Sequence, residues 1–563
     1  MRPERLLALA FVLISSALGQ PVIGGIVSNA SYAQAPNDSS GNPIGHNIIA
    51  QGSIFAVFGT GMGPATLTYA SLPLPISLPD ANGTSITVTG GGKAVNAYLV
   101  YTSAGQLAAI LPSTAPIGDA TVTVTYSGKT SAAATITVVK SQLGIFTANA
   151  QGTGPAAAQH GVDSSAIQLT TAAKPGEVIV IYGTGLGAIS GADNVPPGAV
   201  QVGSNVIVTV AGKVITPDYA GRSPNFAGLD QINFKLPADV TTGCYVPASV
   251  TASGQVSQDF VLSIAASGSV CTHPLGLTQS SLATLDSGGT VNVGLFQMLR
   301  AFIALLGGSI EGAGGLFDNV SANGVFQMYN RIPVAFGAAP YPAPLNGCVV
   351  VDQSNTGSGF SAPDFSLIGG KELVADSIAL SAAGPGGAQS NVLRQDAGGY
   401  LSVFIPPILV PGTWTISGSG GADVGAFNAQ ITLPSNLDWT NRGNFSNVPQ
   451  SDLTIAWTGG TTSGNPVLTV FGNSTIVNAT DPSKSRAKSF YCAAPVSAGK
   501  LVVPAAVRQQ IPSSTTAAGE TAFASLGITT GGFASFNAPL TKGTLNAGTI
   551  AYGEAIVLSV KYQ

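Results

Sequence analysis

Residues 54–64 read IFAVFGTGMGP, and residues 178–188 read VIVIYGTGLGA. Each stretch joins an apolar run to a turn in which glycines alternate with other residues. A dinucleotide-binding loop needs Gly-x-Gly-x-x-Gly and then a helix whose N-terminus meets the pyrophosphate. The first stretch instead has glycines at 59, 61 and 63, and the SLPLPISLP segment that follows contains too many prolines to form a helix. The pattern therefore predicts a core strand that ends in a glycine corner, where positive φ and close backbone packing are required.

The landmarks around these two stretches recur in the same order. After each stretch come a strand, a Leu-Pro pair, a glycine and a further strand. The strands read ITVTGGGK (86–93) and ATVTVTYSG (120–128) in the first copy, and VIVTVAGK (206–213) and ASVTASG (248–254) in the second. A repeat of this length indicates tandem domains and not a solenoid.

Period-two alternation dominates the rest of the chain. Runs such as TSITVT (84–89) alternate polar or small residues with β-branched ones, which is typical of half-buried strands. Helical periodicity is scarce, and residues 279–285 and 505–510 give one or two turns at most. Residues 293–306 are apolar but interrupted by Gln297 and Arg300, which indicates a long buried strand or a short helix. We predict an all-β chain: tandem immunoglobulin-like β-sandwiches, then a C-terminal β-rich region of one or two sandwiches.

The composition excludes several classes of partner. Charged residues make up 8% of the 563 residues, and the net charge is −4. Average soluble proteins contain about 25% charged residues. The chain has no basic footprint for nucleic acid and no polybasic stretch for an anionic membrane.

The first 19 residues have the features of a secretory signal peptide. Two arginines precede an apolar run at 6–18, and small residues at 17–19 favour cleavage before Gln20. The run is too short for a membrane span, which needs about 20 residues. We expect a protein that is secreted or held at the cell surface, with no transmembrane segment in its mature chain.

Further short motifs accompany the two copies: NASY at 29–32, the lead-ins QGS at 51–53 and PGE at 175–177, and QIN at 231–233, where the first copy departs with QLA at 106–108. On these motifs residues 22–271 resemble immunoglobulin-like domains of the IPT/TIG type. More closely, they resemble an uncharacterised tandem repeat found in secreted proteins of soil bacteria. The resemblance implies the fold and no activity.

Four cysteines allow three pairings, and the residues alone leave all three open. Export favours disulfides, and the lack of Cys-x-x-Cys argues against zinc. The resemblance covers the GCYVP run at 243–247 and Cys271, and implies that Cys244 pairs with Cys271. A bond between Cys348 and Cys492 would then make residues 285–510 one folded unit or two packed sandwiches. We expect sandwiches at 20–147 and 148–272, and β-rich domains at 273–435 and 436–563.

No motif assigns a catalytic site. His-Glu-x-x-His, Gly-x-Ser-x-Gly and Asp-x-Asp-x-Asp-Gly are all missing, so we predict no catalytic residues, no metal and no cofactor. Asp423, in the glycine-rich GGADVGAF turn, is either a ligand contact or an acid that stabilises its turn. Tyr341 and Tyr400 are candidates for exposed ligand platforms. The tryptophans alternate in step with aliphatic residues and are expected in the core; they are Trp414, Trp439 and Trp457.

These observations favour a non-enzymatic exported β-protein, a surface or extracellular component that binds a glycan or a cell-surface protein. The rival hypothesis is an exported enzyme that acts on polysaccharide, with its site in residues 272–563. A structural spacer is a third possibility.

Overall fold

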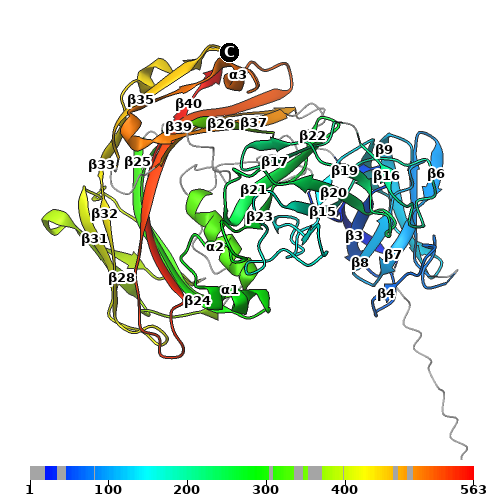
Figure 1. Cartoon of the computed structure of the whole chain (residues 1–563), viewed down its shortest axis with the longest axis horizontal. Helices are drawn as coiled ribbons and strands as arrows, with labels where there is room; N and C mark the ends of the chain where they lie inside the picture. The colour runs from blue at the N-terminus through cyan, green and yellow to red at the C-terminus, as the bar shows by residue number, and fades with distance from the viewer. Residues whose placement is uncertain are drawn as a thin grey trace, which may run out of the picture.

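A computed structural model describes residues 20–33, 46–80, 83–203, 205–303, 308–334, 346–352, 371–396, 398–460, 467–478 and 486–563. The chain is 52% strand and 6% helix, which confirms the all-β prediction (Figure 1). The expected signal peptide at 1–19 lies outside the described residues. No helix in the described ranges is long and apolar enough to span a membrane.

The first sandwich packs two sheets face to face, in the strand orders β1-β3-β8-β7-β4 and β2-β11-β9-β5-β6, with β10 on β9. Its core lies between the sheets and includes Phe55, Ile86 and Leu99, which are fully buried. The strands are β1 (Val22–Ser28), β2 (Asn47–Ala50), β3 (Ile54–Thr60), β4 (Thr68–Tyr69), β5 (Ser85–Gly90), β6 (Lys93–Asn96), β7 (Tyr98–Thr102), β8 (Gln106–Ile110), β9 (Gly118–Tyr126), β10 (Lys129–Thr130) and β11 (Ala134–Val139).

The second sandwich has the same strand order in both of its sheets, β12-β15-β20-β19-β16 and β13-β23-β21-β17-β18, with β22 on β21 and an added β14 on β15. Both copies also share one parallel pair, β2 with β11 and β13 with β23. The strands are β12 (Gly144–Ile145), β13 (Gly154–Pro155), β14 (Ala158–His160), β15 (Val178–Thr184), β16 (Val200–Gln201), β17 (Ile207–Val210), β18 (Lys213–Ile215), β19 (Tyr219–Arg222), β20 (Asp230–Lys235), β21 (Gly243–Ala252), β22 (Gln255–Val256) and β23 (Phe260–Ile264).

The glycine corners are backbone-packing sites, as the sequence predicts. A Cβ atom on Gly59 would lie 2.0 Å from the carbonyl oxygen of Val22, and one on Gly185 would lie 2.1 Å from that of Gln142. Gly185 also has a φ of +113°, which side chains disfavour. No helix follows either corner in the described residues.

A buried polar contact joins the two sandwiches. Arg222 forms a salt bridge with Asp230, and its Nη2 donates to the carbonyl oxygen of Gly52 in the first sandwich at 2.8 Å. The carboxylate of Asp193 accepts from the backbone N–H and the hydroxyl of Ser113, each at 2.7 Å. These bonds hold the corner of the second sandwich against the first.

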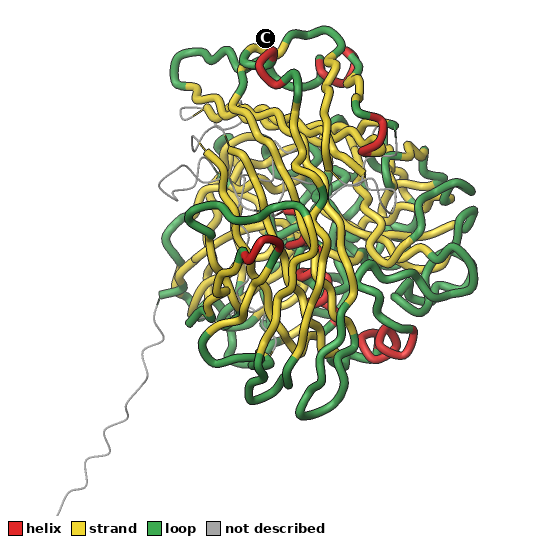
Figure 2. The backbone as a smooth tube through the Cα atoms, turned by 90° about the vertical axis from the view of Figure 1, so that its left-hand side faces the viewer, coloured by secondary structure: helices red, strands yellow, loops and turns green. Residues whose placement is uncertain are grey.

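A large curved sheet organises the C-terminal half, and its concave side faces the second sandwich (Figure 1). Its described strands follow the order β26-β37-β36-β39-β40-β24-β25-β27, with β30 on β25. They are β24 (Val291–Ile303), β25 (Gly308–Val320), β26 (Gly347–Asp352), β27 (Lys371–Glu372), β30 (Tyr400–Val403), β36 (Val467–Asn478), β37 (Arg486–Pro495), β39 (Glu520–Ser535) and β40 (Ala547–Ser559). The long strands lie side by side in Figure 2.

The expected boundary at residue 435 does not separate two sheets. β24 pairs in parallel with β40 from Val293↔Ala547 to Ile303↔Val557. Strands from both sides of the expected boundary therefore belong to one sheet, and a local sequence pattern carries no sign of this long-range pairing.

Smaller sheets cover the convex side of the large sheet. One has the order β29-β28-β31-β32 and another β33-β35-β38, while β34 pairs with β41. All three tryptophans lie in the resulting cores, which confirms their predicted packing; Trp414, Trp439 and Trp457 are at most 3% exposed. The strands are β28 (Ala379–Ala383), β29 (Gln389–Leu393), β31 (Gly412–Gly418), β32 (Phe427–Leu433), β33 (Ser435–Trp439), β34 (Asn447–Val448), β35 (Leu453–Gly460), β38 (Lys500–Val503) and β41 (Lys561–Tyr562).

Two helices lie between the second sandwich and the concave side of the large sheet (Figure 1). α1 (Gln279–Asp286) begins at Thr278, whose side chain caps the N–H of Ser281. α2 (Ala322–Val334) is not predicted from the sequence. The ring of Phe326 in α2 packs edge-on against Tyr245, with centroids 5.3 Å apart.

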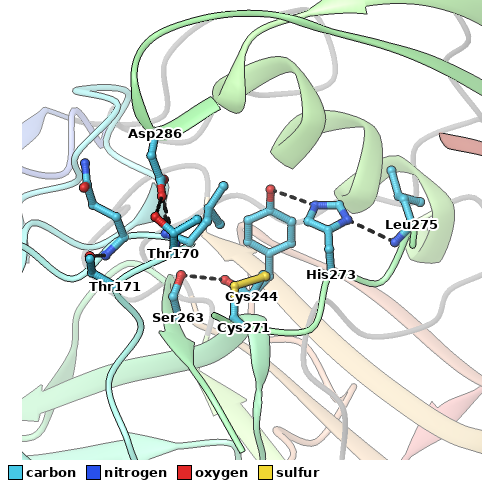
Figure 3. The surroundings of a disulfide bond; sticks show 11 residues. Thr170, Thr171, Cys244, Ser263, Cys271, His273, Leu275 and Asp286 are labelled. Atoms are coloured by element: carbon cyan, nitrogen blue, oxygen red, sulfur yellow. Dashed lines mark hydrogen bonds between the residues drawn. A yellow bond between two sulfur atoms is a disulfide. The ribbon is translucent and has the colours of Figure 1, made fainter. Parts of the chain in front are cut away.

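Two disulfides are present, Cys244–Cys271 and Cys348–Cys492. The first agrees with the pairing that the resemblance implies, and it lies where the second sandwich joins the C-terminal half (Figure 3). Beside it, His273 is buried: its Nδ1 accepts from the N–H of Leu275 at 3.1 Å, and its Nε2 lies 3.3 Å from the hydroxyl of Tyr245.

Candidate ligand-binding face

The structure does not bring together the site residues predicted from the sequence. Tyr341 lies outside the described residues. Tyr400 is fully buried and donates its hydroxyl to the carbonyl oxygen of Asp376 at 2.7 Å, so the expectation of an exposed platform is wrong. Asp423 is half-buried, and its carboxylate accepts from the backbone N–H of Val374 at 3.1 Å, so it ties its turn to a segment 49 residues earlier in the chain.

Two glutamates of the C-terminal half share a face of the large sheet, on either side of Arg300. Arg300 is directly opposite Glu311 on one neighbouring strand and Glu554 on the other. Both carboxylates are buried, at 6% and 3% exposure, and accept backbone N–H bonds from Leu409 and Leu437. Arg300 forms a salt bridge with Glu554. This cluster ties the smaller sheets to the large one and does not present paired carboxylates to solvent.

A row of aromatic residues lies on the first sandwich; exposed aromatic residues elsewhere are Phe226 of the second sandwich (59%) and Phe523 and Phe533 of β39 (60% and 74%). The row lies on the outer surface of the β1-β3-β8-β7-β4 sheet, because the odd-numbered residues of β3 point into the core and the even-numbered ones point outward. We call this surface the aromatic face; its members are Tyr32, Phe58, Tyr69, Tyr101 and Gln106. Tyr69 is 68% exposed and Phe58 37%, and the others are half-buried.

The members form a connected row across the strands. The rings of Tyr32 and Phe58 have centroids 6.3 Å apart, and those of Tyr69 and Tyr101 are 5.9 Å apart. Gln106 links the two pairs, since it is directly opposite Phe58 and donates its Nε2 to the hydroxyl of Tyr101 at 2.7 Å. From β3 to β4 the row crosses three strand spacings, or about 14 Å. That length suits an extended ligand.

A β-bulge puts the tyrosines of β7 on one surface. Tyr98 and Tyr101 are three residues apart and would point to opposite faces of a regular strand. The register shifts between Leu99 and Tyr101, so that Tyr98 opposes Ile110 while Tyr101 opposes Ala108. Both tyrosines therefore lie on the outer surface with Ala108 and Ile110.

The aromatic face is electrically neutral. The five strands that carry it contain no Asp, Glu, Lys, Arg or His. Burial, together with the neighbouring Tyr32 and Tyr69, raises the pKa of Tyr101 to about 12, so its hydroxyl keeps its proton at physiological pH. The face thus offers aromatic rings, hydroxyls and an amide, with no formal charge.

Sequence reasoning missed this face because it looked for rings in the C-terminal half. A usable signal exists in the first half. In β3, Ile54, Ala56 and Phe58 occupy the positions that alternate with the core residues, so Phe58 is expected on the outer surface. The last residue of β4 is a tyrosine. The position of Tyr101 could not be inferred, because the bulge leaves no mark in the sequence pattern.

No group of three His, Cys, Asp or Glu in the described ranges is arranged to hold a metal ion. No protein-family model matches the sequence, and no curated protein matches it.

Several solved structures are similar in part. SGBP-B of the Bacteroides ovatus mixed-linkage glucan utilization locus is 10% identical, with 83% of this chain and 94% of that chain covered and a TM-score of 0.14. Domains 5–6 of the S-layer protein SbsC are 11% identical, with 44% and 99% covered and a TM-score of 0.17. The plexin A4 extracellular region is 10% identical, with 45% and 19% covered and a TM-score of 0.15, so the chain spans about a fifth of it. At such TM-scores these similarities carry no argument about function.

Proposed function

We propose that this protein is an exported, non-enzymatic binding protein that holds an uncharged polysaccharide on the aromatic face of its first sandwich. The observation that carries the proposal is the row of four rings and one amide on a neutral sheet surface. Two disulfides support an oxidising, extracytoplasmic location.

The chemistry of the face favours sugar. A pyranose ring has an apolar C–H face that packs on an aromatic ring, and hydroxyls at its edge that hydrogen-bond to amides and phenols. The hydroxyl of Tyr101 already accepts from Gln106, so the two side chains are held in place before a ligand arrives. An acidic polysaccharide would find no cationic partner on these strands, which is why we assign an uncharged one.

The test uses the mature full-length chain and a panel of soluble uncharged polysaccharides: hydroxyethylcellulose, galactomannan, dextran and starch. Binding is measured by affinity gel electrophoresis and then by titration calorimetry on the best ligand. Tyr69→Ala and Tyr101→Ala should each weaken binding roughly 10- to 30-fold, the effect of removing a central aromatic contact.

Phe523→Ala is the matched control, because Phe523 is 60% exposed but lies on β39 of the C-terminal half. It should bind as the wild type does. The proposal fails if the wild type is not retarded by any polysaccharide of the panel, or if Tyr69→Ala and Tyr101→Ala bind as tightly as the wild type. Release of reducing sugar by the wild type would instead favour the rival enzyme hypothesis.

A further inference from the structure

The second sandwich places similar side chains at the positions that form the aromatic face in the first. In the first sandwich Phe58 opposes Gln106, and in the second Tyr182 opposes Gln231. Two residues after each glutamine, Ala108 on β8 is opposite Tyr101 of β7, and Asn233 on β20 is opposite Tyr219 of β19. The register thus equates Tyr182, Gln231 and Tyr219 with Phe58, Gln106 and Tyr101.

This second set, which we call the amide face, has more amides. Its members are Gln159, Tyr182, Tyr219, Gln231 and Asn233, all half-buried. The hydroxyl of Tyr182 donates to Oε1 of Gln159 at 2.8 Å, and Nε2 of Gln231 donates to Oδ1 of Asn233 at 3.0 Å. Each amide has two donor hydrogens and an acceptor oxygen, so the set keeps hydrogen-bonding groups for an external hydroxyl.

The C-terminal half packs against the other sheet of this sandwich. Its apolar contact includes Tyr245 of β21 and Val261 of β23, which belong to the β13-β23-β21-β17-β18 sheet. The amide face lies on the β15-β20-β19 sheet. Two cations lie on these three strands: the exposed Lys235 at the end of β20, and Arg222 at the end of β19, which is buried in its salt bridge with Asp230.

We propose that the amide face is a second, weaker site for the same uncharged polysaccharide; this rests on the proposed function of the aromatic face. It is weaker because its rings are less exposed and because β16, Val200–Gln201, takes the place of the strand that carries Tyr69. The amides compensate in part by bonding to sugar hydroxyls. The protein would then hold polysaccharide at two points along its tandem sandwiches.

The experiment is titration calorimetry of the full mature chain with the polysaccharide that the wild type binds. The background variant, Tyr69→Ala with Tyr101→Ala, removes the aromatic face. It should keep a residual, weaker binding phase, and adding Tyr182→Ala should weaken that phase by about tenfold or more. Val178→Ala, on the same strand and the same surface, is the control and should leave the residual phase unchanged.

Tyr182→Phe checks that the ring itself matters, because it loses the bond to Gln159 but keeps the stacking surface. It should retain the residual phase to within about threefold. The inference is overturned if the wild type binds but the background variant shows no residual phase, or if Tyr182→Ala leaves that phase unaltered. A wild type that binds no polysaccharide overturns the proposed function itself.

Discussion

The two sandwiches have one topology and differ in what their shared positions carry. The first presents exposed rings on its outer sheet, while the second presents amides there and uses its glycine corner for a buried salt bridge. At the corner, Arg222 opposes Asp230 in the second sandwich, whereas in the first the equivalent strands are joined there by the short connection at residues 103–105. The comparison shows that the sheet framework tolerates very different chemistry once the corner glycines and the core alternation are kept.

The largest expected effect comes from breaking the salt bridge that only the second sandwich has. Burial raises the pKa of Asp230, and the Arg222 guanidinium opposes this by stabilising the carboxylate. Arg222→Met should lower the free energy of unfolding by about 3–5 kcal/mol, because it leaves a buried charge without its partner. Calorimetry of the full chain measures the loss.

The double variant Arg222→Met with Asp230→Asn is the control. The asparagine keeps an acceptor for the N–H of Leu186, which bonds to Asp230 at 2.7 Å, and removes the charge. It should be more stable than Arg222→Met alone. If it is not, the charge of Asp230 is not what the arginine compensates.

The next effect is a loss of stability in acid, and it arises from the buried His273, in the segment that follows the second sandwich; the first sandwich has only the exposed His46. Burial lowers the pKa of His273 to about 4, below its unfolded value near 6.5. Between these values the unfolded state binds a proton that the folded state excludes, so stability falls as pH drops from about 6.5 to 4. The loss should reach about 3 kcal/mol.

His273→Asn checks this prediction. Its Oδ1 can accept from the N–H of Leu275 as Nδ1 does, and it does not titrate. Urea unfolding at pH 7 and pH 4.5 should differ less in this variant than in the wild type. If the difference in unfolding free energy between pH 7 and pH 4.5 is the same in His273→Asn as in the wild type, groups other than His273 cause the acid sensitivity.

A smaller effect of opposite sign is expected from Asp259, which stands where the first sandwich has the exposed Ala133. Burial raises the pKa of Asp259 to about 8, and Tyr491 of the large sheet is close enough to sense its charge. The folded state therefore keeps a proton that the unfolded state releases, and stability falls as pH rises from about 4 to 8.

The loss should be on the order of 2 kcal/mol, discounted for the partial exposure of the side chain. Asp259→Ala, which copies the first sandwich, should flatten the dependence above pH 6.5, where His273 no longer contributes. Urea titrations at pH 6.5 and 8.5 measure it. A slope that survives in Asp259→Ala contradicts the assignment.

The smallest expected loss of stability comes from removing a buried serine that both sandwiches have, and it should be equal in the two. Ser131 and Ser257 each accept from a core-strand N–H at 3.0 Å, that of Val124 and of Val250, and each donates to a carbonyl oxygen at 2.8 Å. Ser131→Ala and Ser257→Ala should each reduce stability by about 1 kcal/mol. Unequal losses in calorimetry would show that the two frameworks are not energetically equivalent.

The sequence predicts those structural features that depend on residues close together along the chain. Period-two alternation marks the strands, the paired corners mark the two sandwiches, and the phase of each tryptophan marks it as core. It does not predict α2, whose segment contains Gly324 and Pro333 and lacks strong helical periodicity. Nor does it predict the aromatic face, which depends on the bulge beside Val100 and on strands that meet only in the folded sheet.

The parallel pairing of β24 with β40 has a consequence for biogenesis. β40 is an interior strand, flanked by β24 and β39, yet it comes after all the other described strands of this sheet along the chain. The two sandwiches can form as they emerge, but the large sheet cannot close until β40 has been synthesised. A nonsense mutation shortly before residue 547 would therefore leave β24 and β39 as unpaired edges, prone to aggregation, beneath two intact sandwiches.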